Sequence, residues 1–431
     1  MKNEKLILLM VVFLSVAACG RHQTKSDDSQ GDTIPLRYAH NLTIVEFDDR
    51  TEVTIRNPWD TTTVLHRYIL VPSNSPTKGS ESPEGNSPLM GGLRGASVVR
   101  VPLRRAGVFT SVHCGLIQEL GQQDAIRGIC ELEYINIPFV RQGVAEGRIA
   151  NFGNAMEPTI EVIMDAEPDA LMISPFENSG GYGRVERLGI PIIECADYME
   201  YSPLARAEWM KFYGRLFGCP ERADSLFREV ESRYLALCEL VKAPSDSLMR
   251  GSESEATQES PLMGGLRGAT MGGLKGAPTL IAEKPYSGVW YVPGGGSVMG
   301  ILYRDAGADY LYADRPETGS LPLSVETVFE RGQRADIWII KYNQSAPLTL
   351  AQLKSDYPPF AHFRAFQTGR VYGCNQSTSR FYEETPYHPD RLLADLIRIF
   401  HPELAPRLPD LMEQSPSAAS PKTYFEQLPS K

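Results

Sequence analysis

The sequence contains few of the side-chain patterns that build catalytic or metal sites. Its seven histidines are scattered over 431 residues, and none of its seven cysteines stands in a Cys-x-x-Cys pair or another metal-ligand spacing. A zinc site made by several such ligands is therefore not expected. Neither the Gly-x-Ser-x-Gly elbow of many hydrolases nor the His/Glu spacing of metalloproteases occurs. The formal net charge of -10, without any basic run, argues against nucleic acid as a partner.

The long apolar run of this chain lies at its N-terminus. Residues 6–16 are too short to cross a bilayer, which takes about 20 apolar residues, and have the build of a secretory signal. The ending Val-Ala-Ala-Cys19 resembles the lipobox of bacterial lipoproteins, which implies cleavage before Cys19 and a lipid on its sulfur. We expect a signal peptide over 1–18, a lipidated tether over 19–35, and a mature protein anchored to a bacterial membrane and facing the periplasm. An ordinary signal peptide with a chance cysteine is the alternative.

Six further cysteines follow Cys19. An exported chain permits disulfides, and six cysteines allow about 15 pairings. We expect buried free thiols, and a single bridge remains open.

The chain is long enough for two domains with their own cores. Residues 36–71 alternate apolar and polar and predict two or three antiparallel strands. From residue 98 onward, beginning with a strand over 98–103, apolar strands alternate with short helices, which predicts mostly parallel sheets with helices on both faces. Residues 203–217 predict one helix, and Pro220 opens another that is about 35 Å long. The predicted fold is α/β, with two such lobes bridged by one long α-helix.

The expected organisation follows from these patterns. It has an N-terminal lobe over 36–202, helices that include the inter-lobe helix over 203–243, a C-terminal lobe over 278–402 and a C-terminal tail over 403–431.

Two stretches rich in Gly, Ser, Pro and Glu interrupt the α/β rhythm, at 73–97 and 244–277. The decapeptide SPLMGGLRGA occurs in both, at 87–96 and 260–269. Such stretches cannot bury a core, and they lack the strand, helix and Gly-Lys-Ser/Thr ending of a phosphate-binding loop. We expect neutral insertions into surface loops, whose joint deletion leaves folding intact.

Ligands of open α/β sheets bind outside the carboxyl ends of the strands. The loops after the expected strands carry many aromatic side chains and an arginine, which suit a large, flat or anionic ligand. The alternative is that these aromatic side chains close the ends of the lobes. The candidate ligand-binding residues are Phe109, His113, Tyr182, Tyr286, Trp290, Tyr291, Asn343, Arg380 and Tyr382.

Several ordered motifs resemble the binding proteins of ATP-driven importers for iron complexes and vitamin B12. They are GNAMEPTIE at 153–161, EPDALMI at 167–173, SVETV at 324–328 and ADIWII at 335–340. The resemblance implies a class III substrate-binding fold that is monomeric, carries no cofactor of its own and delivers its cargo to a permease with ATPase subunits. It also implies that Glu161 and Glu326, one per lobe, contact the permease. Ordinary helix N-terminal charge is the other explanation for these glutamates.

The expected function is therefore capture of a metal chelate in the cleft between the lobes. A ferric siderophore, haem or a cobalamin would suit this site. An extracytoplasmic lipoprotein hydrolase that uses the same cleft is the alternative, and an adhesin or assembly scaffold is a third reading. The protein is not expected to be an enzyme.

Overall fold

The N-terminal part of the chain forms a sheet of its own. The computed structural model describes residues 31–74, 95–177, 181–243, 276–412 and 423–431; the signal peptide, Cys19 and both copies of the decapeptide lie largely or wholly outside them. The first sheet runs in chain order, antiparallel from β1 to β4, and β5 then pairs parallel to β4. Its strands are β1 (Asp32–Thr33), β2 (Leu42–Glu46), β3 (Thr51–Arg56), β4 (Val64–Pro72) and β5 (Ser97–Val101). The strand expected to open the α/β region therefore closes this sheet instead.

The N-terminal lobe contains the second sheet, in the order β11-β10-β6-β7-β8-β9. All its pairs are parallel except β8 with β9. The strands are β6 (Ala106–Val108), β7 (Ile126–Cys130), β8 (Ala150–Asn154), β9 (Glu157–Pro158), β10 (Ala170–Ile173) and β11 (Ile192–Glu194). The helices of this lobe are α2 (Ser111–Glu119), α3 (Pro138–Ala145) and α4 (Ile160–Ala166), with 3-10 turns at Gln123–Ala125, Leu132–Tyr134, Glu186–Leu188 and Ala196–Met199.

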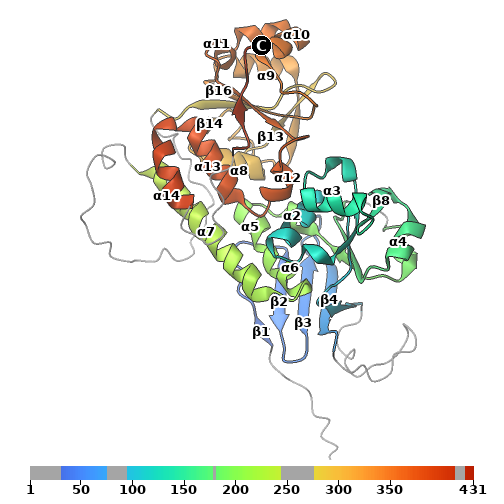
Figure 1. Cartoon of the computed structure of the whole chain (residues 1–431). Coiled ribbons are helices and arrows are strands. Elements are labelled where there is room, and N and C mark those ends of the chain that lie inside the picture. The colour runs from blue at the N-terminus through green and yellow to red at the C-terminus, as the bar shows by residue number, and fades with distance from the viewer. Residues whose placement is uncertain (1–30, 75–94, 178–180, 244–275, 413–422) are drawn as a thin grey trace, which may run out of the picture.

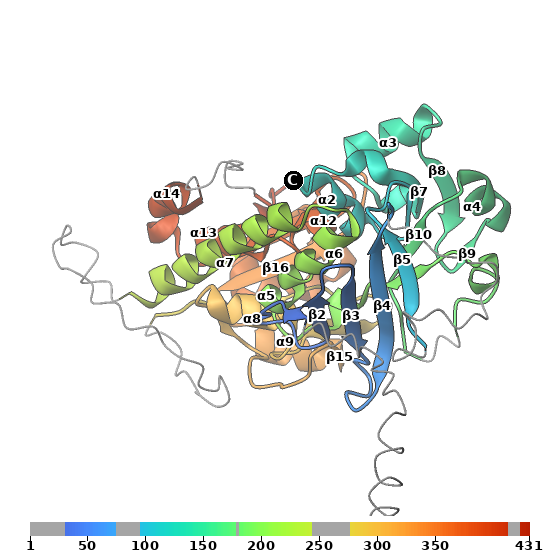
Figure 2. The ribbon, with the colours of Figure 1, turned by 90° about the horizontal axis from the view of Figure 1, so that it is seen from below.

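Three helices connect the lobes. The single helix expected over 203–217 is wrong: α5 (Pro203–Glu208) and α6 (Met210–Leu216) meet at Trp209, whose backbone N–H bonds to the Arg206 carbonyl three residues back. The buried Trp209 indole also donates to Glu200 at 2.9 Å, so side-chain packing fixes the break. The long helix α7 (Pro220–Lys242) is confirmed, and it runs from beside α6 to beside α13 and α14 (Figures 1 and 2).

The C-terminal lobe contains a sheet in the order β14-β12-β16-β17-β18, parallel apart from β18. Its strands are β12 (Thr279–Ala282), β14 (Asp309–Tyr310), β16 (Ile337–Tyr342), β17 (Val371–Asn375) and β18 (Glu426–Gln427), and β13 (Val289–Pro293) pairs separately with β15 (Ser320–Ser324). The helices are α8 (Val298–Asp305), α9 (Val325–Gly332), α10 (Leu350–Asp356), α11 (Arg364–Gln367), α12 (Phe381–Glu384), α13 (Pro389–Phe400) and α14 (Leu408–Met412), with 3-10 turns at Pro358–His362 and Pro402–Arg407.

The expected C-terminal tail contributes to this lobe. β18 adds an antiparallel strand to β17, and Tyr424, Phe425 and Leu428 are buried. The carboxylate of Asp395 on α13 accepts the backbone N–H groups of Tyr424 and Phe425, each at 2.9 Å. The described end of the chain is therefore part of the lobe and not an appendage.

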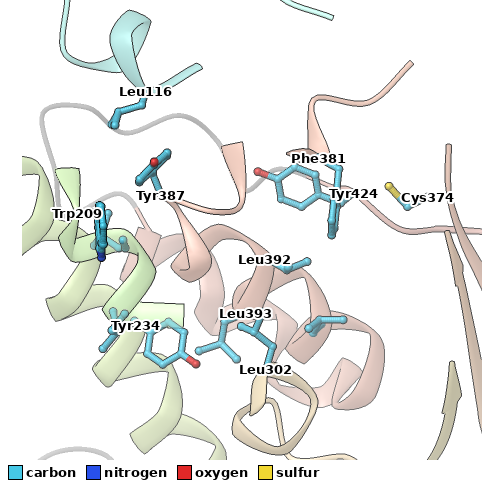
Figure 3. Packing of buried hydrophobic residues seen from close by; sticks show 14 of the residues in the cluster. Leu116, Trp209, Tyr234, Leu302, Cys374, Phe381, Tyr387, Leu392, Leu393 and Tyr424 are labelled. Atoms are coloured by element: carbon cyan, nitrogen blue, oxygen red, sulfur yellow. The ribbon is translucent and has the colours of Figure 1, made fainter. Parts of the chain in front are cut away.

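One apolar core passes through both lobes and the connecting helices. Figure 3 shows Tyr234 of α7 close to Leu393 of α13 and Leu302 of α8, with Trp209 and Tyr387 nearby. Because α7 is packed against both lobes along its length, the lobes are held by a shared core and not by a loose linker. This architecture is the predicted two-lobed α/β fold.

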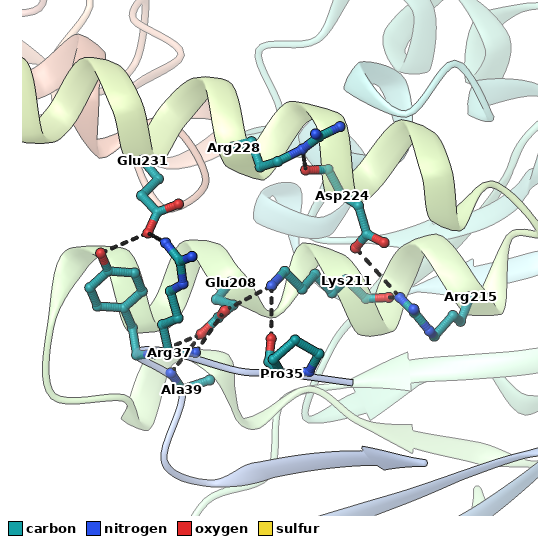
Figure 4. Close-up of polar contacts among 10 residues, drawn as sticks. Pro35, Arg37, Ala39, Glu208, Lys211, Arg215, Asp224, Arg228 and Glu231 are labelled. Atoms are coloured by element: carbon teal, nitrogen blue, oxygen red, sulfur yellow. Dashed lines mark hydrogen bonds and ion pairs between the residues drawn. The ribbon is translucent and has the colours of Figure 1, made fainter. Parts of the chain in front are cut away.

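A short segment that precedes the first long strand binds across the connecting helices; we call residues 35–41 the strap. The fully buried carboxylate of Glu208 accepts the backbone N–H groups of Arg37, Tyr38 and Ala39 at 3.0, 2.8 and 2.9 Å (Figure 4). The side chains of Arg37 and Tyr38 reach Glu231 of α7 at 3.0 and 2.8 Å. The strap, which follows the expected tether, is thus bonded to the inter-lobe helix α7.

Candidate functional site

The carboxyl ends of the parallel strands in both lobes carry the candidate residues. In the N-terminal lobe β6 lies between β10 and β7, so the helices that follow β6 and β10 leave on opposite sides, the arrangement at which α/β sheets bind ligands. The chain passes from β6 through Phe109 and Thr110 directly into α2. Although the loop lies where the sequence placed it, it follows β6 and not the strand expected over 98–103.

Phe109 and His113 are both buried, with 3% and 2% of their surfaces exposed. His113 is enclosed by polar groups: Nδ1 lies 2.5 Å from the Thr110 hydroxyl and Nε2 lies 2.9 Å from Asp197. Asp197 also accepts from Arg206 at 3.0 Å and from Tyr213 at 2.9 Å. Burial acts to raise the pKa of the Asp197 carboxyl, but His113 and Arg206 outweigh it and lower that pKa to about 2. His113 therefore lies inside a satisfied network, and its role as a ligand contact stays a prediction.

Tyr182 lies at the rim of the N-terminal lobe and is half-buried. Its hydroxyl donates a short hydrogen bond to Glu194 at the end of β11. Burial raises the pKa of the Glu194 carboxyl above its ordinary value, although the Tyr182 hydroxyl acts to lower it. Tyr182 thus has a polar partner for its hydroxyl inside the lobe and is not fully buried.

The loop after β12 presents one aromatic side chain and buries another. Tyr286 and Val289 exchange backbone hydrogen bonds across Ser287 and Gly288, whose φ angles are +50° and +82°. This tight turn leaves Tyr286 76% exposed. Trp290, by contrast, is fully buried, and its indole donates to the Ala282 carbonyl at 3.0 Å. The turn therefore leaves Tyr286 outside, whereas Trp290 of the following strand β13 lies in the core.

Tyr291 and Asn343 are both exposed, and Tyr291 is 46% accessible. Tyr382 is 47% exposed, and its hydroxyl accepts a hydrogen bond from Gln376 at 2.9 Å. Arg380 is engaged between the lobes, where it donates to Gln118 of α2 at 3.0 Å. Tyr286, Tyr291 and Tyr382 are thus the candidate aromatic side chains that the C-terminal lobe exposes.

Direct contacts join the lobes beside these residues. The Asn136 side chain donates to the carbonyls of Gln376 and Ser379, both at 3.0 Å, and its backbone N–H bonds to Glu383 at 2.7 Å. A Cβ atom on Gly115 of α2 would lie 2.1 Å from the Glu383 carbonyl oxygen. The close approach of α2 and α12 therefore depends on glycine at this position.

A cavity of about 520 Å³ opens in the C-terminal lobe, and Pro285 and Gly288 of the turn that carries Tyr286 line it. Its walls are largely apolar, and its rim carries three charged side chains. Lys284 on the rim lies 3.9 Å from Asp356, a separation at which an ion pair is weak. The cavity is lined by Lys284, Pro285, Gly288, Val325, Glu326, Leu353, Asp356, Tyr357 and Phe360. A volume in this range suits a small-molecule ligand.

The described residues contain no group of histidine, cysteine and acidic side chains that could hold a metal ion. Within the same residues no helix is long and apolar enough to cross a membrane. The cysteines at positions 114, 130, 195, 219, 238 and 374 are free, and four of them are buried.

Comparison with known proteins agrees with this architecture. Residues 265–378 match the periplasmic binding protein family. A periplasmic haem-binding protein from Pseudomonas aeruginosa superposes with a TM-score of 0.51 at 17% identity and covers 75% of this chain and 97% of its own. The molybdate-binding protein of Haemophilus influenzae superposes at 0.52 with 14% identity, covering 72% and 90%.

The chain is related to the periplasmic binding proteins. Two uncharacterized lipoproteins of Methanocaldococcus jannaschii match it at 23% and 22% identity, over 85% and 92% of this chain and 82% and 94% of their own lengths. The comparisons give no support to a hydrolase.

In this periplasmic binding protein relative, Glu161 and Glu326 occupy equivalent places in the two lobes. Each lies in the first turn of a short helix, α4 or α9, and each is exposed. The Glu161 side chain is 75% exposed, and Arg184 lies 3.7 Å away, a surface pair of little strength. Both carboxylates are therefore accessible to a partner, and their docking role stays a prediction.

Three further aromatic side chains lie after strands of the binding-protein fold. Tyr134 after β7 is 59% exposed, Phe176 after β10 is 44% exposed, and Tyr198 after β11 is 36% exposed. None of the three is among the candidate ligand-binding residues above, although the strand-end rule covers all of them; Tyr134 and Tyr198 lie in 3-10 turns. The signal was missed because their 3-10 turns lack the apolar periodicity that marks an α-helix.

Proposed function

We propose that this protein is the substrate-binding lipoprotein of an ABC importer, and that it captures a metal chelate between its lobes and delivers it to a permease. The observation that carries this proposal is the two-lobed fold on one continuous core, with accessible aromatic side chains at the strand ends of both lobes. The match of residues 265–378 to periplasmic binding proteins supports it. The lipoprotein relatives support anchoring through Cys19.

The ligand half-site of the C-terminal lobe is the cavity beside Tyr286. Its apolar floor and the exposed Tyr286 ring suit the flat, partly apolar body of a chelate. Lys284 on the rim supplies a cation for an acidic substituent. Ferric siderophores, haem and cobalamins share these properties, and each is a testable cargo.

The test is a fluorescence titration of the purified protein with hemin, cyanocobalamin, ferric siderophores and molybdate. Tyr286→Ala should weaken the tightest of these about tenfold, since an aromatic contact is worth about 0.5–1.5 kcal/mol beyond its buried area. The variant should keep the unfolding temperature of the natural protein because Tyr286 is exposed. Trp290→Phe in the following strand β13 is the matched change, and it should lower stability with little effect on affinity. Binding of none of the chelates, or of molybdate alone, would refute the proposed cargo.

Docking is tested separately by charge reversal at Glu161 and Glu326. The double change to lysine should reduce uptake through the cognate permease, and Glu161→Lys alone should retain ligand affinity in solution, because the Glu161 side chain projects from the surface and lies outside the cavity that Glu326 lines. Glu330→Lys on α9 is the control, since this exposed residue lies beyond the first turn of the helix. Normal uptake by the double variant contradicts the docking assignment.

A further inference from the structure

A buried cluster of charged side chains joins α2 of the N-terminal lobe, the inter-lobe helix α7 and α13 of the C-terminal lobe. Arg233 of α7 donates to Asp390 of α13 at 2.6 Å. Arg391 of α13 lies 3.3 Å from Glu119 at the end of α2. These two carboxylates and two guanidinium groups form two ion pairs.

His388 lies between the two carboxylates and is 1% exposed. Its Nε2 atom is 3.7 Å from Glu119 Oε2, and its Nδ1 atom is 3.7 Å from Asp390 Oδ1. Both separations are too long for a hydrogen bond. Within the part of the chain that the structure describes, neither ring nitrogen of His388 has a hydrogen-bond partner, and Asp390 Oδ1 has none either.

The protonation state of the imidazole decides whether these contacts are favourable. A neutral imidazole has one N–H group and one lone pair, so one of its nitrogens turns a lone pair toward a carboxylate oxygen. The imidazolium has two N–H donors, one for each carboxylate. If small movements bring both ring nitrogens within hydrogen-bond distance of the two carboxylates, only the imidazolium can donate to both.

We propose that His388 is a protonation-dependent latch, which when charged joins Glu119 of the N-terminal lobe to Asp390 of the C-terminal lobe and when neutral releases one of them. This latch regulates how readily the lobes separate. The inference stands on the buried geometry and does not require that the cargo of the proposed importer be known.

The groups around the ring support this assignment. Burial acts to raise the pKa of the Glu119 carboxyl, but His388 and Arg391 outweigh it and hold that pKa well below its ordinary value. The pKa of Asp390 is also lowered, against burial, by His388 and Arg233. Both carboxylates therefore stay ionised near neutral pH.

The remaining charged groups near the ring lie on α7 and α12. Glu229 lies 3.8 Å from Arg233, and Glu384 provides the carbonyl that accepts the His388 backbone N–H at 2.9 Å. Imidazole is the side chain that changes charge between about pH 5 and 8. The latch is thus closed when the ring carries two protons and released when it carries one, a change that raising the pH favours.

The test measures the distance between the lobes by pulsed electron spin resonance on the full-length protein in detergent. Spin labels are placed at Asp165→Cys of α4 and Lys354→Cys of α10, both exposed, with the half-buried Cys219 and Cys238 changed to serine. We expect one short distance at pH 5.5, and at pH 8.5 a ratio of separated to closed molecules about tenfold higher, as the loss of one charge-assisted hydrogen bond predicts.

His388→Gln should abolish the difference between the two pH values. If His388→Gln does not fold, Glu119→Gln replaces it, because its side chain is 26% exposed, and this variant should also lose the pH response. His401→Gln is the matched control, because His401 lies 3.4 Å from Glu403 of the same lobe and should leave the pH response intact. A natural protein whose distances do not change with pH, or a response that survives in both His388→Gln and Glu119→Gln, overturns the latch.

Discussion

Replacing Glu208 with alanine tests how strongly the strap is held to the connecting helices. The side chain is fully buried, and besides its three backbone donors it accepts from Lys211 at 2.9 Å. Alanine leaves the N–H groups of residues 37–39 without an acceptor and Lys211 without its carboxylate partner, although Lys211 keeps the Pro35 carbonyl. Each buried unsatisfied donor costs about 1–3 kcal/mol, and breaking a buried ion pair costs about 3–5 kcal/mol. These terms overlap, so the expected loss is about 3–5 kcal/mol.

The assay is thermal unfolding followed by circular dichroism at pH 7. For domains of this size 1 kcal/mol corresponds to about 2–4 °C, so Glu208→Ala should lower the unfolding temperature by roughly 6–20 °C. The unfolding temperature of Glu208→Gln should lie between those of the natural protein and of Glu208→Ala. One acceptor oxygen remains in this variant, while the new amide group faces a backbone N–H.

Glu239→Gln is the control on the same helical layer. Its side chain is 74% exposed and pairs with Lys242 at 3.0 Å, so the change should stay within about 0.5 kcal/mol. A loss below about 1 kcal/mol for Glu208→Ala would show that the strap is not held by this carboxylate, and the reasoning would fail.

Two further changes test the lobe contact and the buried network. Gly115→Ala forces α2 away from the Glu383 carbonyl, so we expect a loss of about 1–3 kcal/mol in unfolding experiments and wider inter-lobe distances; unchanged values of both would contradict the close packing. Asp197→Asn should cost about 3–5 kcal/mol at pH 7. Because folding lowers the pKa of Asp197 from 3.8 to about 2, its stabilisation is present above pH 3.8 and is lost as the pH falls toward 2. The asparagine variant should lack that part of the acid unfolding profile, and an unchanged profile would refute the assignment.

The α/β lobes and the long helix could be predicted because local patterns determine them. Apolar strands such as 170–173 and 337–342 are buried on both faces, as parallel strands between helices are. The helix over 220–242 shows its start at Pro220 and one apolar side along its length. These features depend on neighbours in the sequence and not on distant contacts.

Other features depend on contacts that no local pattern reveals. The break at Trp209 depends on packing of the indole against Glu200, and β18 depends on the remote edge of β17. Position after a strand predicts a loop at Trp290, whereas the structure places this residue in β13 with its side chain in the core. The candidate site is therefore located by the sequence at the level of loops, and its individual contacts stay predictions.

The parallel pairing of β4 with β5 explains why the connection between them can contain the first copy of the decapeptide. Val71 pairs with Arg100 and Tyr68 with Ser97, so the polypeptide must return along the whole strand between Pro72 and Ser97. A connection of this kind needs about a dozen residues, whereas nothing limits how long it becomes. Excision of the decapeptide at 87–96 leaves residues 73–86 to make the return. Removal of all of 73–97, which the sequence led us to expect to be neutral, leaves no path and takes the first residue of β5. The decapeptide at 87–96 thus lies in a connection that has a minimum length but no maximum. Any shortened version of the protein for crystallisation should keep residues 73–86.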